Sequence, residues 1–268
     1  MRRITPVLTS ELFHYFGNPK QVRVGASQAF RLETFRELVE HVARLSFVNK
    51  DYMLFYRGQT NDYRNKAGVS TFYPTIYRGD YLSQGELSGR FRTLKEKGNA
   101  LSHLFEDRKI EGYREVKKRR NIQWSILQHY EVCPTPFLDF THSLRVACSF
   151  ALSNNKAGKG YVFIFALPYL TNRVSLNSEH DLINIRLLSI CPPTALRPYF
   201  QEGYLVCTDG IADKYDTKSE LDFNNRLVAK FEIPNDISFW GKDFDGIPNH
   251  LLYPDKDPVL ELCKEISI

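Results

Sequence analysis

Apolar residues recur every three or four positions in parts of the first half of the chain, which predicts helices. Apolar residues recur at helical spacing from Glu33 to Val48 and again from Ser83 to about Asp107. A third helix is expected to end near Tyr130, because Pro134 and Pro136 cannot continue it. In the first of these helices, the residues expected to face the core are Phe35, Leu38, Val39, Val42 and Leu45.

Strands are predicted where β-branched and aromatic residues cluster. Tyr161 to Leu167 is the clearest of them, since its apolar run is continuous, as in a buried strand. Shorter strands are expected at Met53 to Tyr56, Tyr204 to Thr208 and Leu227 to Ile233, with an extended segment at Thr71 to Tyr77 and a short helix from about Asp257. Helices and strands do not alternate regularly, so the pattern predicts a single mixed α+β domain.

The central stretch from Ile126 to Leu152 concentrates the polar residues of interest. An apolar run at Phe137 to Phe140 is followed by a helix that is expected to start near Thr141. Polar side chains therefore gather at two element ends: His129, Asp139, Thr141, His142, Ser143 and Arg145. Such residues can serve as a site, or they can be helix N-caps that satisfy free backbone N–H groups.

Composition narrows the class of protein. The chain has 268 residues, 43% of them hydrophobic, and a net charge of +5, which permits an anionic ligand or nucleic acid without requiring one. No run approaches the roughly 18 apolar residues of a membrane span, and no signal-peptide pattern follows Met1. Five scattered cysteines without a C-x-x-C pair argue against a disulfide framework or a zinc site, and favour the cytoplasm.

Several enzyme classes are disfavoured by missing motifs. The glycines form neither G-x-G-x-x-G nor a Walker A loop, and neither H-E-x-x-H nor G-x-S-x-G occurs. A basic run at Lys117 to Arg120 is typical of a solvated helix face, or else contacts phosphate.

Arg57 is the candidate anion ligand. It ends a predicted strand, and Gly58 beside it would let a ligand approach closely. Alternatively, Arg57 pairs with a structural carboxylate such as Asp139, which we expect to be at least half-buried because its neighbours are apolar. We expect Arg57, Asp139 and Thr141 to converge. His129 and Tyr130 are candidates for ring stacking, or they are polar residues of the core.

Gln201 and Glu202 come just before a predicted strand. A carboxamide or a carboxylate placed there is suited to a site at a sheet edge, although a surface position would account for both residues as well. Because side chains alternate along an extended segment, the two are expected to point in opposite directions.

These residues resemble the FRG domain family, named for a Phe-Arg-Gly signature. The signature reads Tyr56-Arg57-Gly58-Gln59 here, with Tyr in place of Phe. The resemblance continues through Leu127-Gln128-His129-Tyr130 and Phe137-Leu138-Asp139-Phe140-Thr141, and resumes at Arg197, Gln201 and Gly203-Tyr204. It covers roughly residues 30 to 265, which implies an N-terminal extension over residues 1–30 and an FRG domain over residues 31–268.

The resemblance implies a link to ADP-ribosyltransferases, whose helices pack around a split antiparallel or mixed sheet. By that analogy Arg57 looks like the first site residue and holds the pyrophosphate of NAD. Thr141 or Ser143 looks like the second, with Gly58, His129, Tyr130 and Asp139 around the cofactor. Gln201 or Glu202 looks like the third and stabilises the charge that develops at the ribose.

Three hypotheses follow from this. The first is an NAD-using, ADP-ribosyltransferase-like enzyme, a toxin or phage-defence effector, with an unknown target. The second is a non-catalytic module that binds a nucleotide or RNA through Arg57, His129 and the basic run. The third is a structural or interaction domain, in which the polar cluster only joins element ends.

Overall fold

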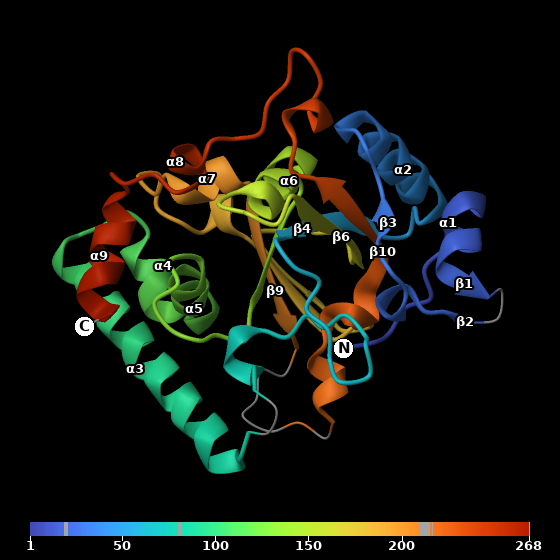
Figure 1. Cartoon of the computed structure of the whole chain (residues 1–268). Helices are drawn as coiled ribbons and strands as arrows, with labels where there is room; N and C mark the ends of the chain where they lie inside the picture. The colour runs from blue at the N-terminus through green and yellow to red at the C-terminus, as the bar shows by residue number, and fades with distance from the viewer. Residues whose placement is uncertain (19–20, 80–81, 210–214, 216, 268) are drawn as a thin grey trace.

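A single mixed sheet runs through the middle of the protein, and helices surround it (Figure 1). The structure is a computed structural model that describes residues 1–18, 21–79, 82–209, 215 and 217–267. Within these residues, eight strands form the sheet in the order β3-β10-β6-β4-β5-β9-β8-β7. Their bounds are β3 Phe30–Arg31, β4 Met53–Gln59, β5 Leu138–Thr141, β6 Lys159–Leu167, β7 Val174–Asn177, β8 Leu182–Arg186, β9 Gly203–Thr208 and β10 Leu227–Pro234. The short strands β1 (Gly17–Asn18) and β2 (Gln21–Val22) pair separately.

The helices divide into groups on either side of the sheet. In Figure 1, α3, α4, α5 and α9 lie to the left, and α1 and α2 lie to the right. Their bounds are α1 Ser10–Phe16, α2 Phe35–Val48, α3 Gln84–Asp107, α4 Tyr113–Lys118, α5 Arg120–His129, α6 Leu144–Leu152, α7 Arg197–Gln201, α8 Asn249–Leu252 and α9 Pro258–Ser267. The structure describes no helix that is both long and apolar enough to cross a membrane.

The structure forms helices and strands where the sequence pattern predicts them most strongly, at α2, α3 and β6. Helix α2 begins after Thr34, whose side chain and that of Glu37 form a capping box, and α3 begins after Ser83, which accepts from the Glu86 N–H. Strand β6 is buried from Val162 to Leu167, as its continuous apolar run predicts. The α+β class is therefore confirmed.

Three details of the prediction are wrong. Val39 is 40% exposed, because the buried stripe of α2 consists of Leu38, His41, Val42 and Leu45. The extended segment ends early, since Thr75–Tyr77 form a 3₁₀ turn. Strand β4 runs three residues past Tyr56, because its backbone stays paired with β6 as far as Gln59 and Tyr161.

The sheet is antiparallel between all neighbours except β3 and β10, within the part of the chain that is described. The joint between β4 and β5 is the weakest, with Tyr56 opposite Thr141 as its one registered pair among the described residues. The two strands therefore separate beyond this pair. Hydrogen bonding nevertheless remains continuous from β3 to β7, so the described strands β3 to β10 form one sheet.

The first 30 residues pack into the same core as the rest. Leu12 and Phe16 of α1 are buried in the main hydrophobic cluster together with residues of β4, β6 and β10. Phe30 pairs with Phe231 at the edge of the sheet. The N-terminal segment is thus a structural part of the domain core.

Two glycines let helix α6 lie directly on the sheet. A Cβ atom at Gly58 would lie 1.7 Å from the carbonyl oxygen of Ala147, and one at Gly160 would lie 2.5 Å from that of Ala151. These glycines belong to the neighbouring strands β4 and β6, and both carbonyls belong to α6. We expected Gly58 to leave room for a ligand. The structure shows instead that its missing side chain leaves room for the backbone of α6.

We predict that Gly58→Ala lowers the free energy of unfolding by about 3 kcal/mol or more, because helix and strand must move apart to admit the methyl group. Urea denaturation measures this loss. Gly89→Ala in α3 is the matched control, since its added Cβ meets nothing within 4 Å. The control should be neutral or more stable by up to about 1 kcal/mol. A Gly58→Ala protein as stable as this control would contradict the close packing.

Candidate functional site

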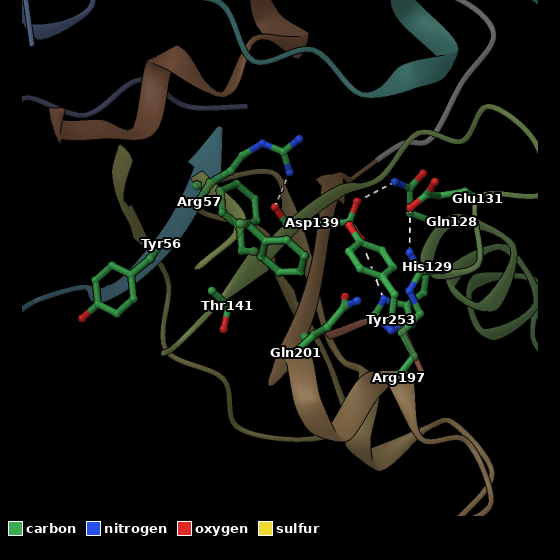
Figure 2. A pocket seen from close by; sticks show the side chains of 14 residues that line it. Tyr56, Arg57, Gln128, His129, Glu131, Asp139, Thr141, Arg197, Gln201 and Tyr253 are labelled. Atoms are coloured by element: carbon green, nitrogen blue, oxygen red, sulfur yellow. Dashed lines mark hydrogen bonds and ion pairs between the residues drawn. The ribbon is translucent and has the colours of Figure 1, made fainter. Parts of the chain in front are cut away.

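A cavity of about 210 Å³ opens where β4 and β5 separate. Arg57, Asp139 and Thr141 all line it, which confirms their expected convergence across 82 residues of sequence. Three further predicted residues also line this cavity: Gly58, His129 and Gln201. Its walls come from β4, β5, α5 and α7, and Tyr253 lies between Gln201 and His129 in the view of Figure 2.

Arg57 reaches across the gap between the strands. One terminal nitrogen donates to the backbone carbonyl of Asp139 at 2.7 Å, and the other points away from Asp139 (Figure 2). The Nε atom is buried and has no hydrogen-bond partner in the described part of the chain. Burial lowers the pKa of Arg57, and the charge of Asp139 opposes that effect. Arg57 remains a cation at neutral pH, with donor capacity to spare.

Asp139 is held by a short chain of side-chain hydrogen bonds. Its Oδ2 accepts from Gln128 Nε2 at 2.6 Å, and the Thr135 hydroxyl donates in turn to Gln128 Oε1. The side chain is 39% exposed to the cavity, yet protein surrounds it closely enough for desolvation to raise its pKa, with Arg57 opposing. The expected half-burial is confirmed, but the Arg57 bond goes to the backbone and the carboxylate binds Gln128.

His129 is a neutral ring in the cavity wall. Burial lowers its pKa to about 3, and the positive charge of Arg197 acts in the same direction. Its Nδ1 lies 4.0 Å from Asp139 Oδ1, so the two groups are neighbours without forming an ion pair at neutral pH. His129 therefore adds no charge to the site.

Arg197 is a second guanidinium in the wall. It pairs with Glu131 at 2.7 Å, and its Cζ lies 4.5 Å from the centroid of the Tyr253 ring. Its Nε is buried and finds no hydrogen-bond partner among the described residues. The cavity thus combines two cations with two carboxylates, of which Glu131 is already paired.

Of the other predicted site residues, Gln201 and Thr141 line the cavity, and Glu202 and Ser143 lie outside it. The Gln201 amide donates to the Leu252 carbonyl at 2.8 Å, whereas Glu202 caps α7 in the left-handed conformation, is exposed, and is absent from the cavity wall. Thr141 Oγ1 accepts from the Ser143 N–H, and Ser143 caps α6 outside the wall. Gln201 and Glu202 do point in different directions, as expected. The cause is the left-handed end of α7 at Glu202 and not the alternation of side chains along a strand.

Tyr130 is a core residue and does not line the cavity. Its hydroxyl donates to Asp257 at 2.8 Å, and the same carboxylate accepts from the backbone N–H groups of Leu196, Arg197 and Val259. Asp257 thereby joins α5, α7 and α9. The alternative of a satisfied core residue is correct for Tyr130.

The basic run belongs to a helix surface. Lys117 pairs with Glu106 at 2.6 Å, and none of the four residues lines this cavity. The solvated-face interpretation therefore agrees with the structure.

Sequence reasoning overlooked Gln128, Glu131, Arg197 and Tyr253 as site residues. Arg197 and Tyr253 lie 140 and more residues beyond Arg57, so local patterns give no sign that they meet it. Glu131 takes a positive φ of 57°, a turn that periodicity does not reveal. The available signals were the family resemblance at Leu127-Gln128-His129-Tyr130 and its resumption at Arg197.

The neutral His129 predicts an acid-dependent loss of stability. Its pKa is lower in the folded state than the ordinary 6.5, so the unfolded chain binds the extra proton as pH falls from 6.5 toward 3. Stability is therefore fully present above that window and is lost within it. We expect His129→Gln to reduce the loss between about pH 6 and about pH 4 by roughly 2 kcal/mol. Urea titrations at several pH values measure it. The exposed control His103→Gln should keep the parent's slope, and equal slopes for both variants would refute the assignment.

Comparison with known families matches residues 53–160 to the FRG domain. No curated protein and no solved structure shows a significant match to the chain. The matched segment is shorter than the span of the sequence motifs, but it contains β4, α5, β5 and α6, and with them Arg57, His129 and Asp139. The strands β4 and β5, at whose opening the cavity lies, thus belong to the segment that matches the FRG domain.

Proposed function

We propose that the cavity binds a nucleotide through its phosphates, and that this nucleotide is NAD. The observation that carries the proposal is the state of Arg57. Its guanidinium lies in a recessed cavity and donates a hydrogen bond to a neutral backbone carbonyl. Among the described residues, no carboxylate lies within 4.0 Å of it. A desolvated cation with unused donors favours an anion that accepts from a planar fork, as phosphate does.

The distribution of charge supports NAD over a purely anionic nucleotide. NAD carries a cationic nicotinamide ring at one end and a pyrophosphate in its middle. Arg57 suits the phosphate, while the Asp139 carboxylate and the Tyr253 ring suit the cationic aromatic end. Neutral His129 leaves the negative charge of Asp139 uncancelled on that side.

The likeness to ADP-ribosyltransferases suggests which chemistry to test. NAD, when bound, would supply a glycosidic C–N bond whose cleavage by an acceptor releases nicotinamide and leaves the acceptor's proton to the medium. Asp139 would stabilise the positive charge that develops at the ribose. Gln201 is retained as the third site residue, because it lines the cavity and Glu202 does not.

A second candidate function is nucleotide binding without turnover. It is favoured by the position of Glu202, because the carboxylate expected from the third motif lies outside the cavity on an exposed helix end. In that case Arg57 and its neighbours would recognise a nucleotide as a signal.

Arg57→Lys is expected to weaken NAD binding by about 10- to 150-fold, because the ammonium keeps the charge and loses the fork. Isothermal calorimetry of NAD into the parent and the variant measures this. Arg36→Lys is the control, since the Arg36 side chain is 89% exposed on α2. Its affinity for NAD should equal that of the parent.

Asp139→Asn separates the enzyme from the binding module. In an enzyme, nicotinamide release at saturating NAD should fall at least about tenfold, since the charge acts most strongly as the bond breaks. This fall comes in addition to the loss of NAD affinity that removing the charge beside the nicotinamide causes. Glu202→Gln serves as the control and should leave release unchanged. A parent protein that binds NAD without releasing nicotinamide establishes the binding module. A parent that does not bind NAD refutes the enzyme, and one that binds neither NAD nor ADP refutes the binding module as well.

A further inference from the structure

A second cavity of about 530 Å³ adjoins the first, and Arg57 lines both. The second cavity is bounded on one side by Gln59 and Leu138, which flank the opening between β4 and β5, and on the other by Tyr63, Tyr73 and Arg78. It contains a cation and two phenol rings that the proposed NAD site has not used.

Strand alternation places the two cavities on opposite sides of the opening. Gly58 faces α6, and Tyr56 and its partner Thr141 lie on that same side. Arg57 and Gln59 therefore face the other side of β4, where the second cavity lies. Since the strands have no registered pair beyond Tyr56 and Thr141 in the described chain, Arg57 is the side chain that separates one cavity from the other.

The polar groups of the second cavity suit a phosphorylated, aromatic ligand. Arg78 Nε donates to the Tyr73 carbonyl at 3.0 Å, which orients the guanidinium. Burial lowers the pKa of both Arg57 and Arg78, and the charge of Asp139 opposes it in each case, so both remain cations. Gln59 Oε1 is buried and accepts no hydrogen bond from the residues that the structure describes. Tyr63 is 56% exposed, so its ring is open to stacking.

The volume of the first cavity also indicates that a dinucleotide would need the second one. Sites for ligands of drug size or larger usually enclose about 300–1,000 Å³. The first cavity, at about 210 Å³, falls below that range. It would hold a nicotinamide ring with its ribose, and the rest of a dinucleotide needs other space.

We propose that the second cavity is the subsite for the ADP portion of the ligand, with Arg78 and Arg57 on its phosphates and Tyr63 stacked on its base. The inference rests on the proposed function for the identity of the ligand. Arg57 then holds the bridging phosphates between the two cavities. Gln59 would accept a hydrogen bond from the ligand, and Asp139 would remain with the nicotinamide end.

Calorimetric titration with three compounds tests the subsite: NAD, ADP, and nicotinamide mononucleotide, which lacks the ADP portion. Arg78→Gln should weaken NAD and ADP at least about tenfold, the value of one lost charge-assisted hydrogen bond, and leave the mononucleotide within about twofold. Arg92→Gln, an exposed residue of α3, is the control and should change none of the three affinities. Tyr63→Ala should weaken ADP binding and leave unchanged the binding of inorganic pyrophosphate, which is titrated as a fourth compound because it has no base to stack.

The outcomes separate the subsite from the proposed function. If the parent binds NAD and the mononucleotide but Arg78→Gln changes neither NAD nor ADP, the subsite is refuted and the NAD proposal stands. If the parent binds ADP through Arg78 but neither binds the mononucleotide nor releases nicotinamide, the subsite stands and the NAD proposal is refuted. Equal losses for all three compounds in Arg78→Gln, or no binding by the parent, overturn the subsite.

Discussion

The direct contact of the α6 backbone with Gly58 is the constraint on which the site depends. Only a residue without Cβ allows the Ala147 carbonyl to occupy that side of β4, and Gly160 allows the same for Ala151 on β6. Because side chains alternate along a strand, a glycine that faces α6 directs Arg57 to the opposite side. Gly58 and Arg57, the glycine and arginine of the signature, thus act together. Gly58 allows α6 to pack against β4, and this packing fixes the side of the strand to which the Arg57 side chain points.

The opening beside β4 then gives Arg57 its surroundings. With Tyr56 and Thr141 as the last registered pair, the Arg57 side chain takes the place of a backbone donor and binds the Asp139 carbonyl at 2.7 Å. Gln128 and Thr135 hold the carboxylate of the same residue. Asp139 is thereby tied to Arg57 through its backbone and to α5 through its side chain, which leaves the guanidinium without a direct counter-ion among the residues that the structure describes.

Buried polar networks supply the remaining walls. Asp257 accepts from Tyr130 and from two N–H groups at the start of α7, and so places Arg197 and Gln201 at the cavity. The cost of burying charge keeps His129 neutral, so positive charge in the wall comes from the two guanidinium groups. An arrangement of fixed cations, one unpaired carboxylate and a neutral ring suits a ligand that carries both signs of charge.

The sequence by itself determined the helices and strands with strong periodicity, the α+β class, and the meeting of Arg57, Asp139 and Thr141. Those features follow from local spacing, capping residues and family motifs, which act within a few turns of chain. Tertiary structure decided the rest. Whether Tyr130 stacks on a ligand or binds Asp257 depends on a residue 127 positions away, and Gly58 meets α6 rather than a ligand because of how the helix packs. Glu202 lies outside the site because α7 ends there in the left-handed conformation. Arg197 lies in the cavity wall because its backbone N–H binds Asp257, near the C-terminus. Contacts of such long range carry no periodic signal, so only the folded chain reveals them.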